Sequence, residues 1–451
     1  MAKLCRFVAV APLAILSIAA CVGDDPVAAG IDVPDAADGG TESSTPTPTP
    51  PASAAIAVAP MSLPFPVTAP AGTSATSDVV ITNKGTAPAE PLEQAVITGA
   101  QAGSFRIVSD ECQAKALGIA ESCTIGIAFT PLGEGPAAAT LSVGTLTVAL
   151  SGTSSVFLPE ASDQAAQSSF NAVHAADATR VHAVGLNGRV MTSTDGTTWT
   201  VVSAPAGSTE LRAVYASADG HVYVGGKGPF LMVQAPGTTG FATVTLPSSN
   251  PMTAIHALWA TPSGAQQKDV VALGEGGRWL DFPQGTTPST TLSVGTGTAV
   301  YAVSGAHNPA GGGSTSFCAV GANATTHGYY SAAGSDLMPT VLSPSSRTFK
   351  AVWTDGTSVV AGASDGTIHR GASCSSLEVE ATFAGVSFNG IWGTGSELWT
   401  VGSGGAIYHS MTPGSWKKVE SGTTADLRAV HGTSASNVYV VGDGVILHKK
   451  Q

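Results

Sequence analysis

The sequence predicts an all-β protein with two folded domains, a small β-sandwich followed by a seven-bladed β-propeller. Val, Thr, Ser and Gly dominate while helix-favouring residues are scarce, and only 11% of the 451 residues are charged. Residues 59–153 contain short apolar runs of strand length, and residues 154–451 repeat one unit seven times. The net charge of −12, without clusters of Lys or Arg, argues against nucleic-acid binding.

The first 20 residues have the features of an export signal. Lys3 and Arg6 precede an apolar stretch, residues 7–20, that is too short to span a bilayer as a mature helix. Its end, Ile18-Ala19-Ala20-Cys21, resembles the lipobox of bacterial lipoproteins, which implies removal of residues 1–20 and lipidation of Cys21. The alternative is an ordinary signal peptide cut after Ala20. By analogy with lipoprotein sorting, Val22 favours the outer membrane, on its periplasmic or surface face.

Residues 21–58 are expected to form a disordered, lipid-anchored linker. They are rich in Ala, Asp, Pro, Thr and Ser and include TPTPTPP at 45–51. No apolar periodicity is present, so little surface could be buried on folding. The proline run favours an extended spacer that holds the folded part away from the lipid surface.

Residues 59–153 are expected to form the sandwich. Four runs have strand length and apolar patterning: SDVVITN (77–83), SFRIV (104–108), CTIGIAF (123–129) and LTVALSG (146–152). Asn83-Lys84-Gly85 is a turn signal between two of the strands.

The same segment resembles the Ig-like domains of the ASPM–SPD-2–Hydin type, called choice-of-anchor D in bacterial proteins. The likeness lies in ITNKGTAP (81–88), ITGAQAGSF (97–105), SDEC (109–112), ESCTIGIAFTP (121–131) and VALSGT (148–153). The resemblance implies an Ig-like β-sandwich and a disulfide between Cys112 and Cys123, which an exported protein would form. A zinc site is the competing interpretation, but no further Cys or His ligand lies nearby.

The remaining chain consists of seven copies of one unit. Its first phrase is FNAVH (170–174), LRAVY (211–215), MTAIH (252–256), VYAVS (300–304), FKAVW (349–353), FNGIW (388–392) and LRAVH (427–431). A second strand ending in Gly follows each phrase, as in VHAVG (181–185), and a third strand comes next. In several copies Trp opens a fourth strand, as in WTVVS (199–203) and WKKVE (416–420).

Four strands in about 40 residues is the layout of a propeller blade, so seven copies predict seven blades. The last copy stops after three strands. We expect SVFLP (155–159) to supply its fourth strand, so that the two ends of the propeller pair and leave no open sheet edge.

STDGTTW (193–199) resembles the Asp-box of sialidases through Ser193, Asp195, Gly196 and Trp199. A weaker copy, SMTPGSW (410–416), stands at the same place between a third and a fourth strand. Recurrence at a position fixed by the fold favours a structural turn. The sialidase catalytic set, three arginines with a Tyr–Glu pair and an Asp, is not found.

Two positions of the first phrase carry polar or aromatic residues. The last position holds His174, His256, His431, Trp353, Trp392 and Tyr215, which favours packing between blades over a metal site. The second position holds Arg212, Lys350, Arg428, Asn171 and Asn389. These side chains are either solvated groups near the channel or an anion-binding ring. We expect no cofactor and no metal.

Two further features concern the middle blades. Cys318 and Cys374 fall in adjacent blades and would pair if the geometry of their strands permits a disulfide. Blades three and four carry extra residues near PSGAQQKD (262–269) and HNPAGGGSTS (307–316). Such loops are either tolerated insertions or binding elements on a rigid scaffold.

The propeller resembles the bacterial YVTN/BNR-like repeat group, which includes the propeller of the photosystem II assembly factor. LRAVHGTSASNVYVVGDGVILH (427–448) carries the likeness. The resemblance implies a propeller fold and a binding role rather than a reaction. Together with the lipobox, it leads us to expect a non-enzymatic cell-envelope lipoprotein whose propeller binds an unidentified protein or glycan. The alternatives are a propeller hydrolase or lyase of the sialidase kind, and an assembly factor for an envelope complex. No catalytic residue set stands out.

Overall fold

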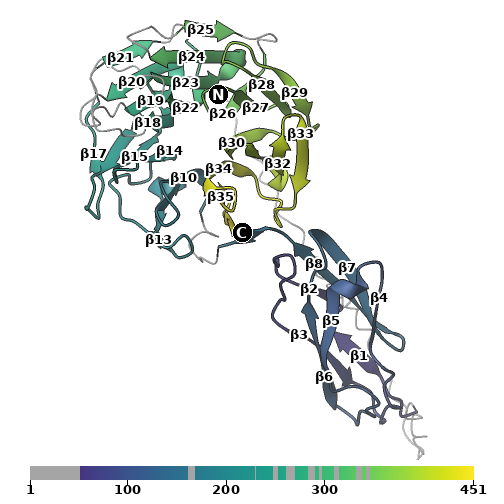
Figure 1. Cartoon of the computed structure of the whole chain (residues 1–451). Coiled ribbons are helices and arrows are strands. Elements are labelled where there is room, and N and C mark those ends of the chain that lie inside the picture. The colour runs from purple at the N-terminus through teal and green to yellow at the C-terminus, as the bar shows by residue number, and fades with distance from the viewer. Residues whose placement is uncertain are drawn as a thin grey trace, which may run out of the picture. The chain divides into compact units, whose positions relative to one another are not determined.

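The computed structural model of the chain describes residues 51–160, 168–228, 230–246, 252–260, 270–282, 290–293, 297–308, 314–331, 338–341 and 346–450. Its regular elements are β-strands and single turns of 3-10 helix (Figure 1). The described residues contain no helix that is long and apolar enough to cross a membrane. The predicted signal peptide, residues 1–20, and the predicted lipidation site, Cys21, lie outside the described residues and stay predictions.

Two four-stranded sheets near the N-terminus share one hydrophobic core. Their strand orders are β1 (Ile56–Ala59), β3 (Ser77–Asn83), β6 (Ser122–Phe129), β5 (Phe105–Asp110) and β2 (Ser62–Pro64), β8 (Leu146–Ser154), β7 (Gly135–Val143), β4 (Val96–Thr98). Alternating residues such as Val79 and Ile81 of β3 face this core and are fully buried. The four strands expected from the sequence are β3, β5, β6 and β8.

The predicted boundary between the linker, residues 21–58, and the first folded domain lies too far along the chain. Strand β1 already begins at Ile56 and pairs antiparallel with β3, with Ile56 opposite Asn83. The Ala55 N–H also donates to Oδ1 of the fully buried Asn83 (3.2 Å). The short apolar run of β1 follows an Ala- and Pro-rich stretch, so its pattern is too brief to be recognised without its partner strand.

Seven further four-stranded antiparallel sheets surround a common centre in the order of the chain, as blades of a propeller (Figure 1). They are β10 (Phe170–Ala175), β11 (Val181–Gly185), β12 (Val190–Ser193), β13 (Trp199–Val201); β14 (Leu211–Ala216), β15 (Val222–Gly226), β16 (Phe230–Gln234), β17 (Ala242–Thr243); β18 (Ile255–Ala260), β19 (Val270–Gly274), β20 (Arg278–Phe282), β21 (Thr290–Ser293); β22 (Val300–Asn308), β23 (Ser314–Gly321), β24 (Thr325–Ser331), β25 (Met338–Val341); β26 (Phe349–Thr354), β27 (Val359–Ala363), β28 (Thr367–Gly371), β29 (Glu378–Thr382); β30 (Phe388–Thr394), β31 (Glu397–Gly402), β32 (Ile407–Thr412), β33 (Ser415–Val419); and β34 (Leu427–Ser434), β35 (Asn437–Gly442), β36 (Val445–Lys450) with β9 (Phe157–Pro159). The first strand of each blade, the inner strand, lies nearest the centre.

The register expected for blade three is wrong by three residues. Ile255, not Met252, pairs with Gly274, as Phe170 pairs with Gly185 in blade one. The inner strand therefore reads IHALW (255–259), and His256 occupies its second position rather than its fifth. Both MTAIH and IHALW have an apolar first and fourth residue, so the sequence pattern alone could not separate them.

The predicted closure of the ring is confirmed. Strand β9 pairs with β36, with Phe157 opposite Lys449 and Pro159 opposite Leu447. Just after β9, the Glu160 side chain is 6% exposed, and its Oε1 lies 2.8 Å from His448 Nδ1 and 2.9 Å from Lys450 Nζ. A buried carboxylate therefore ties the first propeller strand to the last.

We predict that Glu160→Ala lowers the free energy of unfolding by about 3 kcal/mol, because it leaves the buried His448 without its charged partner. Urea denaturation of the full chain measures the change. Glu378→Ala, an exposed substitution on β29, is the control and should cost no more than about 0.5 kcal/mol. Equal effects of the two substitutions would contradict the role assigned to Glu160.

Candidate functional site

The second residue of every inner strand is the extra residue of a β-bulge. In each blade the register shifts between the first and third residues of the inner strand, for example between Phe170 and Ala172. A bulge leaves the extra residue out of the ladder and redirects its side chain. These seven residues, which we call the channel ring, are Asn171, Arg212, His256, Tyr301, Lys350, Asn389 and Arg428.

Glycine makes room for this bulge. A Cβ on Gly185 would overlap the carbonyl oxygen of Ser169, the residue before the inner strand. The same overlap would arise at Gly226, Gly274, Gly321, Gly402 and Gly442. The Gly that ends the second strand of the repeat is thus required for close backbone approach rather than for a turn. In blade five Ala363 takes this register position instead.

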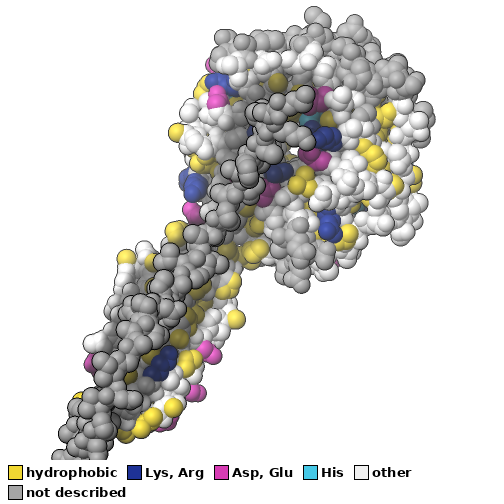
Figure 2. All heavy atoms as spheres, turned by 180° about the vertical axis from the view of Figure 1, so that it is seen from behind, with side chains coloured by type: hydrophobic (Ala, Val, Ile, Leu, Met, Phe, Trp, Pro, Cys, Tyr) yellow, Lys and Arg dark blue, Asp and Glu magenta, His cyan; other side chains and the backbone are white. Residues whose placement is uncertain are grey.

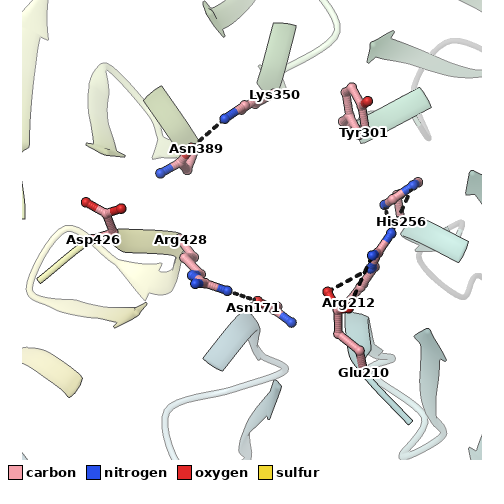
Figure 3. Close-up of a pocket in the computed structure, with 9 residues that line it drawn as sticks. All are labelled: Asn171, Glu210, Arg212, His256, Tyr301, Lys350, Asn389, Asp426 and Arg428. Atoms are coloured by element: carbon pink, nitrogen blue, oxygen red, sulfur yellow. Dashed lines mark hydrogen bonds and ion pairs between the residues drawn. The ribbon is translucent and has the colours of Figure 1, made fainter. Parts of the chain in front are cut away.

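The channel ring lines a cavity of about 370 Å³ together with Glu210 and Asp426. The nine side chains surround one central space, and each blade contributes at least one of them (Figure 3). Basic and acidic side chains also gather around the centre of the propeller on the face shown in Figure 2. The structure therefore brings together the five second-position residues expected from the sequence and adds His256 and Tyr301.

Blades two and three hold a closed cluster of charges. Arg212 donates from Nε to Glu210 Oε1 (3.0 Å) and from Nη2 to Glu210 Oε2 (3.3 Å). The Arg212 guanidinium lowers the pKa of Glu210. His256 lies 3.3 Å from Arg212 Nη1 through Nδ1 and 2.8 Å from Glu275 Oε1 through Nε2. Burial lowers the pKa of His256, so the ring carries a neutral imidazole here at neutral pH.

Arg428 of blade seven is also partnered. Its Nη1 donates to Asn171 Oδ1 in blade one (2.5 Å), and its Nη2 lies 2.8 Å from Asp443 Oδ1. Asn171 in turn donates to the Leu211 carbonyl of blade two (2.7 Å). Hydrogen bonds thus connect three successive blades and fix the side chains of Arg428 and Asn171.

Lys350 of blade five differs from both arginines. Its Nζ donates to Ser387 Oγ (3.2 Å) and lies 3.5 Å from Asn389 Oδ1, both neutral groups of blade six. No described carboxylate lies within ion-pair distance of this ammonium.

The fifth residue of the inner strand contacts the sixth residue of the next blade. His174 Nδ1 accepts from the Ala216 N–H (3.3 Å), and His431 Nδ1 accepts from the Ala175 N–H (3.2 Å). Three more side chains hydrogen-bond the backbone of the next blade. Tyr215 and Trp353 donate to the carbonyls of Ala260 and Gly393. Ser304 Oγ accepts from the Thr354 N–H. The predicted packing between blades is confirmed for His174, His431, Trp353 and Tyr215.

Residue size is matched across this contact. Each Trp faces a Gly of the next blade, namely Trp259 with Gly305, Trp353 with Gly393 and Trp392 with Gly432. The smaller His and Tyr rings face Ala instead. A Cβ on Gly305 would overlap the Trp259 ring, so a larger residue at position 305 requires a smaller ring or a shift of the Trp259 side chain.

Two histidines meet where the propeller closes. The rings of His174 and His431 lie 4.0 Å apart between centroids, and Tyr215 lies 4.5 Å from His174. Burial lowers the pKa of His431 to about 4 and that of His174 well below its usual value. Both rings are therefore neutral in the folded protein at neutral pH. Within the described residues no group of three or more His, Cys, Asp or Glu side chains is placed to hold a metal.

The Asp-box forms a tight turn away from the channel ring. Asp195 Oδ1 accepts from the N–H groups of Thr197 (2.8 Å) and Thr198 (2.6 Å) and from Ser193 Oγ (3.1 Å). Trp199 is 7% exposed and packs edge-on against Tyr439 of blade seven.

Gly196 lets this turn dock on the neighbouring blade. It has a φ of 75° and accepts a hydrogen bond from the Tyr439 hydroxyl (3.1 Å). The interpretation of STDGTTW as a turn thus agrees with the geometry, and the turn also links the first and last blades.

Both expected disulfides are present. Cys112 and Cys123 are bonded with their Cα atoms 5.2 Å apart, and Cys318 and Cys374 are bonded at 5.5 Å. The second bond joins blades four and five. Of the long loops of blades three and four, residues 262–269 and 309–313 lie outside the described residues.

Comparisons with known proteins show similarity in structure alone. No protein-family model matches the chain, and no curated protein matches it. Among solved structures, YCF48 from Cyanidioschyzon merolae is 15% identical, covers 65% of this chain and 98% of its own, and gives a TM-score of 0.51. YCF48 bound to D1 peptide is 14% identical, covers 63% of this chain and 92% of its own, and gives 0.50.

A lyase has the same fold. A catalytically inactive variant of virginiamycin B lyase from Staphylococcus aureus, solved with quinupristin, is 12% identical, covers 65% of this chain and 97% of its own, and gives a TM-score of 0.55. At such identities the likeness establishes the fold only. Together with the seven four-stranded sheets, it shows that this chain contains a β-propeller.

We predict that Gly305→Ala destabilises the protein by about 1–3 kcal/mol, because the added methyl group overlaps the Trp259 ring. The double variant Trp259→Tyr/Gly305→Ala recreates the Tyr–Ala combination of Tyr215 and Ala260 and should recover part of the loss. A double-mutant cycle compares the free energies of unfolding of the unmodified chain, the two single variants and the double variant, measured by denaturation. Strictly additive losses would contradict the size-matched contact.

We predict that acidification destabilises the propeller through His431. Above the unfolded pKa of about 6.5 both states are neutral, so the stability is fully present. As the pH falls toward the folded pKa of about 4, only the unfolded chain takes up this proton, which costs about 3 kcal/mol. His431→Gln should flatten the fall between pH 7 and 4.5 in urea denaturation. The same slope in both proteins would exclude His431 as the cause.

Proposed function

We propose that the chain is a non-enzymatic binding protein of the cell envelope, anchored by lipid at Cys21, whose propeller holds a protein or glycan ligand at the channel ring. One observation carries this proposal. A bulge in every blade directs one side chain to a common cavity, and six of the seven are polar or charged residues with the seventh a tyrosine.

The geometry supports recognition because the ring is organised in advance. Hydrogen bonds of 2.5–3.3 Å fix Asn171, Arg212 and Arg428 on a rigid scaffold. Side chains that are already fixed lose little conformational entropy on binding. One solved propeller of similar fold is described as bound to a peptide, which fits a binding role for such a scaffold.

The N-terminal part supports the proposed location. We propose that its two sheets are an Ig-like β-sandwich that separates the propeller from the lipid anchor. The Cys112–Cys123 and Cys318–Cys374 bonds fit an exported protein, because disulfides persist in oxidising compartments. An outer-membrane position rests on the lipobox resemblance and on Val22.

A lyase or hydrolase is the second candidate. The neutral His256 bonded to Glu275 at the cavity could act as a general base, and Tyr301 lies beside it, with ring centroids 5.1 Å apart. Against this, Glu210 is held by Arg212, and no hydrogen bond in the described residues joins Tyr301 to a carboxylate. The residues thus support ligand contact better than a catalytic sequence.

We predict that affinity capture from detergent-solubilised envelopes recovers a partner that depends on the ring. The full chain serves as bait beside Arg428→Ser, which removes the contacts to Asn171 and Asp443. Lys417→Met, on the outer strand β33, is the matched control because it removes one cation elsewhere in the propeller. A partner retained by Lys417→Met and lost by Arg428→Ser supports the proposal.

A glycan array with product analysis tests the other ligand class in parallel. Ring-dependent retention of an unchanged glycan supports binding, and ring-dependent cleavage that His256→Ala abolishes would establish the enzyme alternative. Identical capture and glycan profiles for all variants would reject the ring as the binding site. Equal thermal midpoints must first show that each variant is folded.

A further inference from the structure

Two blades carry the same charged sequence pattern with different outcomes. Glu210-Leu211-Arg212 begins the inner strand of blade two, and Asp426-Leu427-Arg428 begins that of blade seven. In blade two the acid and the arginine form a two-point ion pair. In blade seven Arg428 turns instead to Asp443 and Asn171.

Asp426 is therefore left with an uncompensated charge. Its Oδ1 accepts a hydrogen bond from the Gly404 N–H (2.8 Å), which holds the carboxylate in the lining of the cavity. No described Lys, Arg or His lies within ion-pair distance of it.

Lys350 carries an unpaired positive charge that complements the unpaired negative charge of Asp426. It is the channel-ring cation that contacts only the neutral groups Ser387 and Asn389 among the described residues. In Figure 3 Lys350, Asn389 and Asp426 follow one another around the cavity, so both unpaired charges lie on the same arc of the ring. The opposite arc holds the closed cluster of Glu210, Arg212 and His256.

We propose that this arc binds a zwitterionic group, with the ligand carboxylate on Lys350 and the ligand ammonium on Asp426. The inference deepens the proposed binding function and rests on it. A ligand with both charges neutralises both side chains at once, whereas a simple anion leaves Asp426 as a repulsive neighbour. Charge-assisted hydrogen bonds on both sides would supply affinity and orientation.

Ser387 and Asn389 fit this assignment. Ser387 Oγ accepts from Lys350, and Asn389 uses its Nδ2 to donate to the Leu427 carbonyl (2.9 Å), which leaves Oδ1 toward Lys350. These contacts position the ammonium of Lys350 without neutralising it. The cavity of about 370 Å³ accommodates a small molecule or the end of a longer chain.

Calorimetric titration of the full chain with ω-amino acids measures the spacing of the two charges. The series runs from glycine through β-alanine and 4-aminobutyrate to 6-aminohexanoate, with butyrate and butylamine as ligands that carry one charge each. We expect one length to bind best, and to bind at least about tenfold more tightly than either single-charge ligand.

Lys350→Met and Asp426→Asn should each weaken the best ligand at least about tenfold. Lys417→Met and Glu378→Gln are the matched controls, because they remove one cation and one anion on outer strands. The double variant Lys350→Glu/Asp426→Lys restores one charge of each sign and should regain zwitterion binding. Nα-acetyl-lysine and an N-acetylated tripeptide ending in lysine then separate a free ligand from a chain end.

Equal affinity for butyrate and the best amino acid, with no effect of Asp426→Asn, would overturn the inference and identify an anion site. Absence of binding to every member of the series would also overturn it. Neither result removes the proposed function, because capture lost in Arg428→Ser would still assign a ligand to the ring. Failure of that capture experiment, by contrast, would reject the ring itself.

Discussion

The β-bulge at the second residue of every inner strand is the constraint on which the site depends. It brings the preceding carbonyl against the second strand, where a Cβ would overlap it at the six Gly positions, while Ala363 takes this position in blade five. It also removes the second side chain from the ladder and from the packed faces of the blade. Asn, Arg, His, Tyr and Lys can therefore occupy this position while the first residue stays apolar and fully buried. The fold and the proposed binding site are thus encoded at neighbouring positions of the inner strand.

The contact between the fifth and sixth residues gives the ring its rigid base. In five blades the fifth side chain of the inner strand hydrogen-bonds the backbone of the next blade. In the other two, Trp259 and Trp392 pack against a Gly of the next blade. The chain closes the circle twice at the last blade. Strand β9 completes the sheet of β34–β36, and the turn around Gly196 receives the Tyr439 hydroxyl. Displacement of a blade is thus opposed by the inner-strand contacts, and at the last blade also by the pairing of β9 with β36 and by the bond between Tyr439 and Gly196.

The sequence predicts the repeat and five of the seven ring residues because the first phrase recurs along the chain. It predicts the closure because the last copy lacks a fourth strand, which SVFLP (155–159) can supply. The register of blade three was missed because Met252 and Ile255 both satisfy the apolar pattern, and the pairing with Gly274 becomes visible only across the sheet. His256 was missed as a ring member because of this register. Tyr301 already stood at the second position of VYAVS (300–304), but it was not grouped with the Arg, Lys and Asn residues of the other copies. Strand β1 left too short a pattern, and the partners of Arg212, Lys350 and Arg428 depend on side-chain conformations that no spacing rule contains.

The distribution of charge in the ring follows from its one-residue-per-blade construction. A ring side chain reaches acids of its own blade and groups of the adjacent blade, so its neutralisation depends on nearest neighbours. Arg212 pairs with Glu210, and Arg428 pairs with Asp443. The two groups of blade six that Lys350 reaches, Ser387 and Asn389, are uncharged. Asp426 begins the blade that follows blade six, and it forms no ion pair with Arg428 because Arg428 pairs with Asp443. A group in the central space can approach both charges together, because the blades converge there and the intervening Asn389 is already bonded to the backbone.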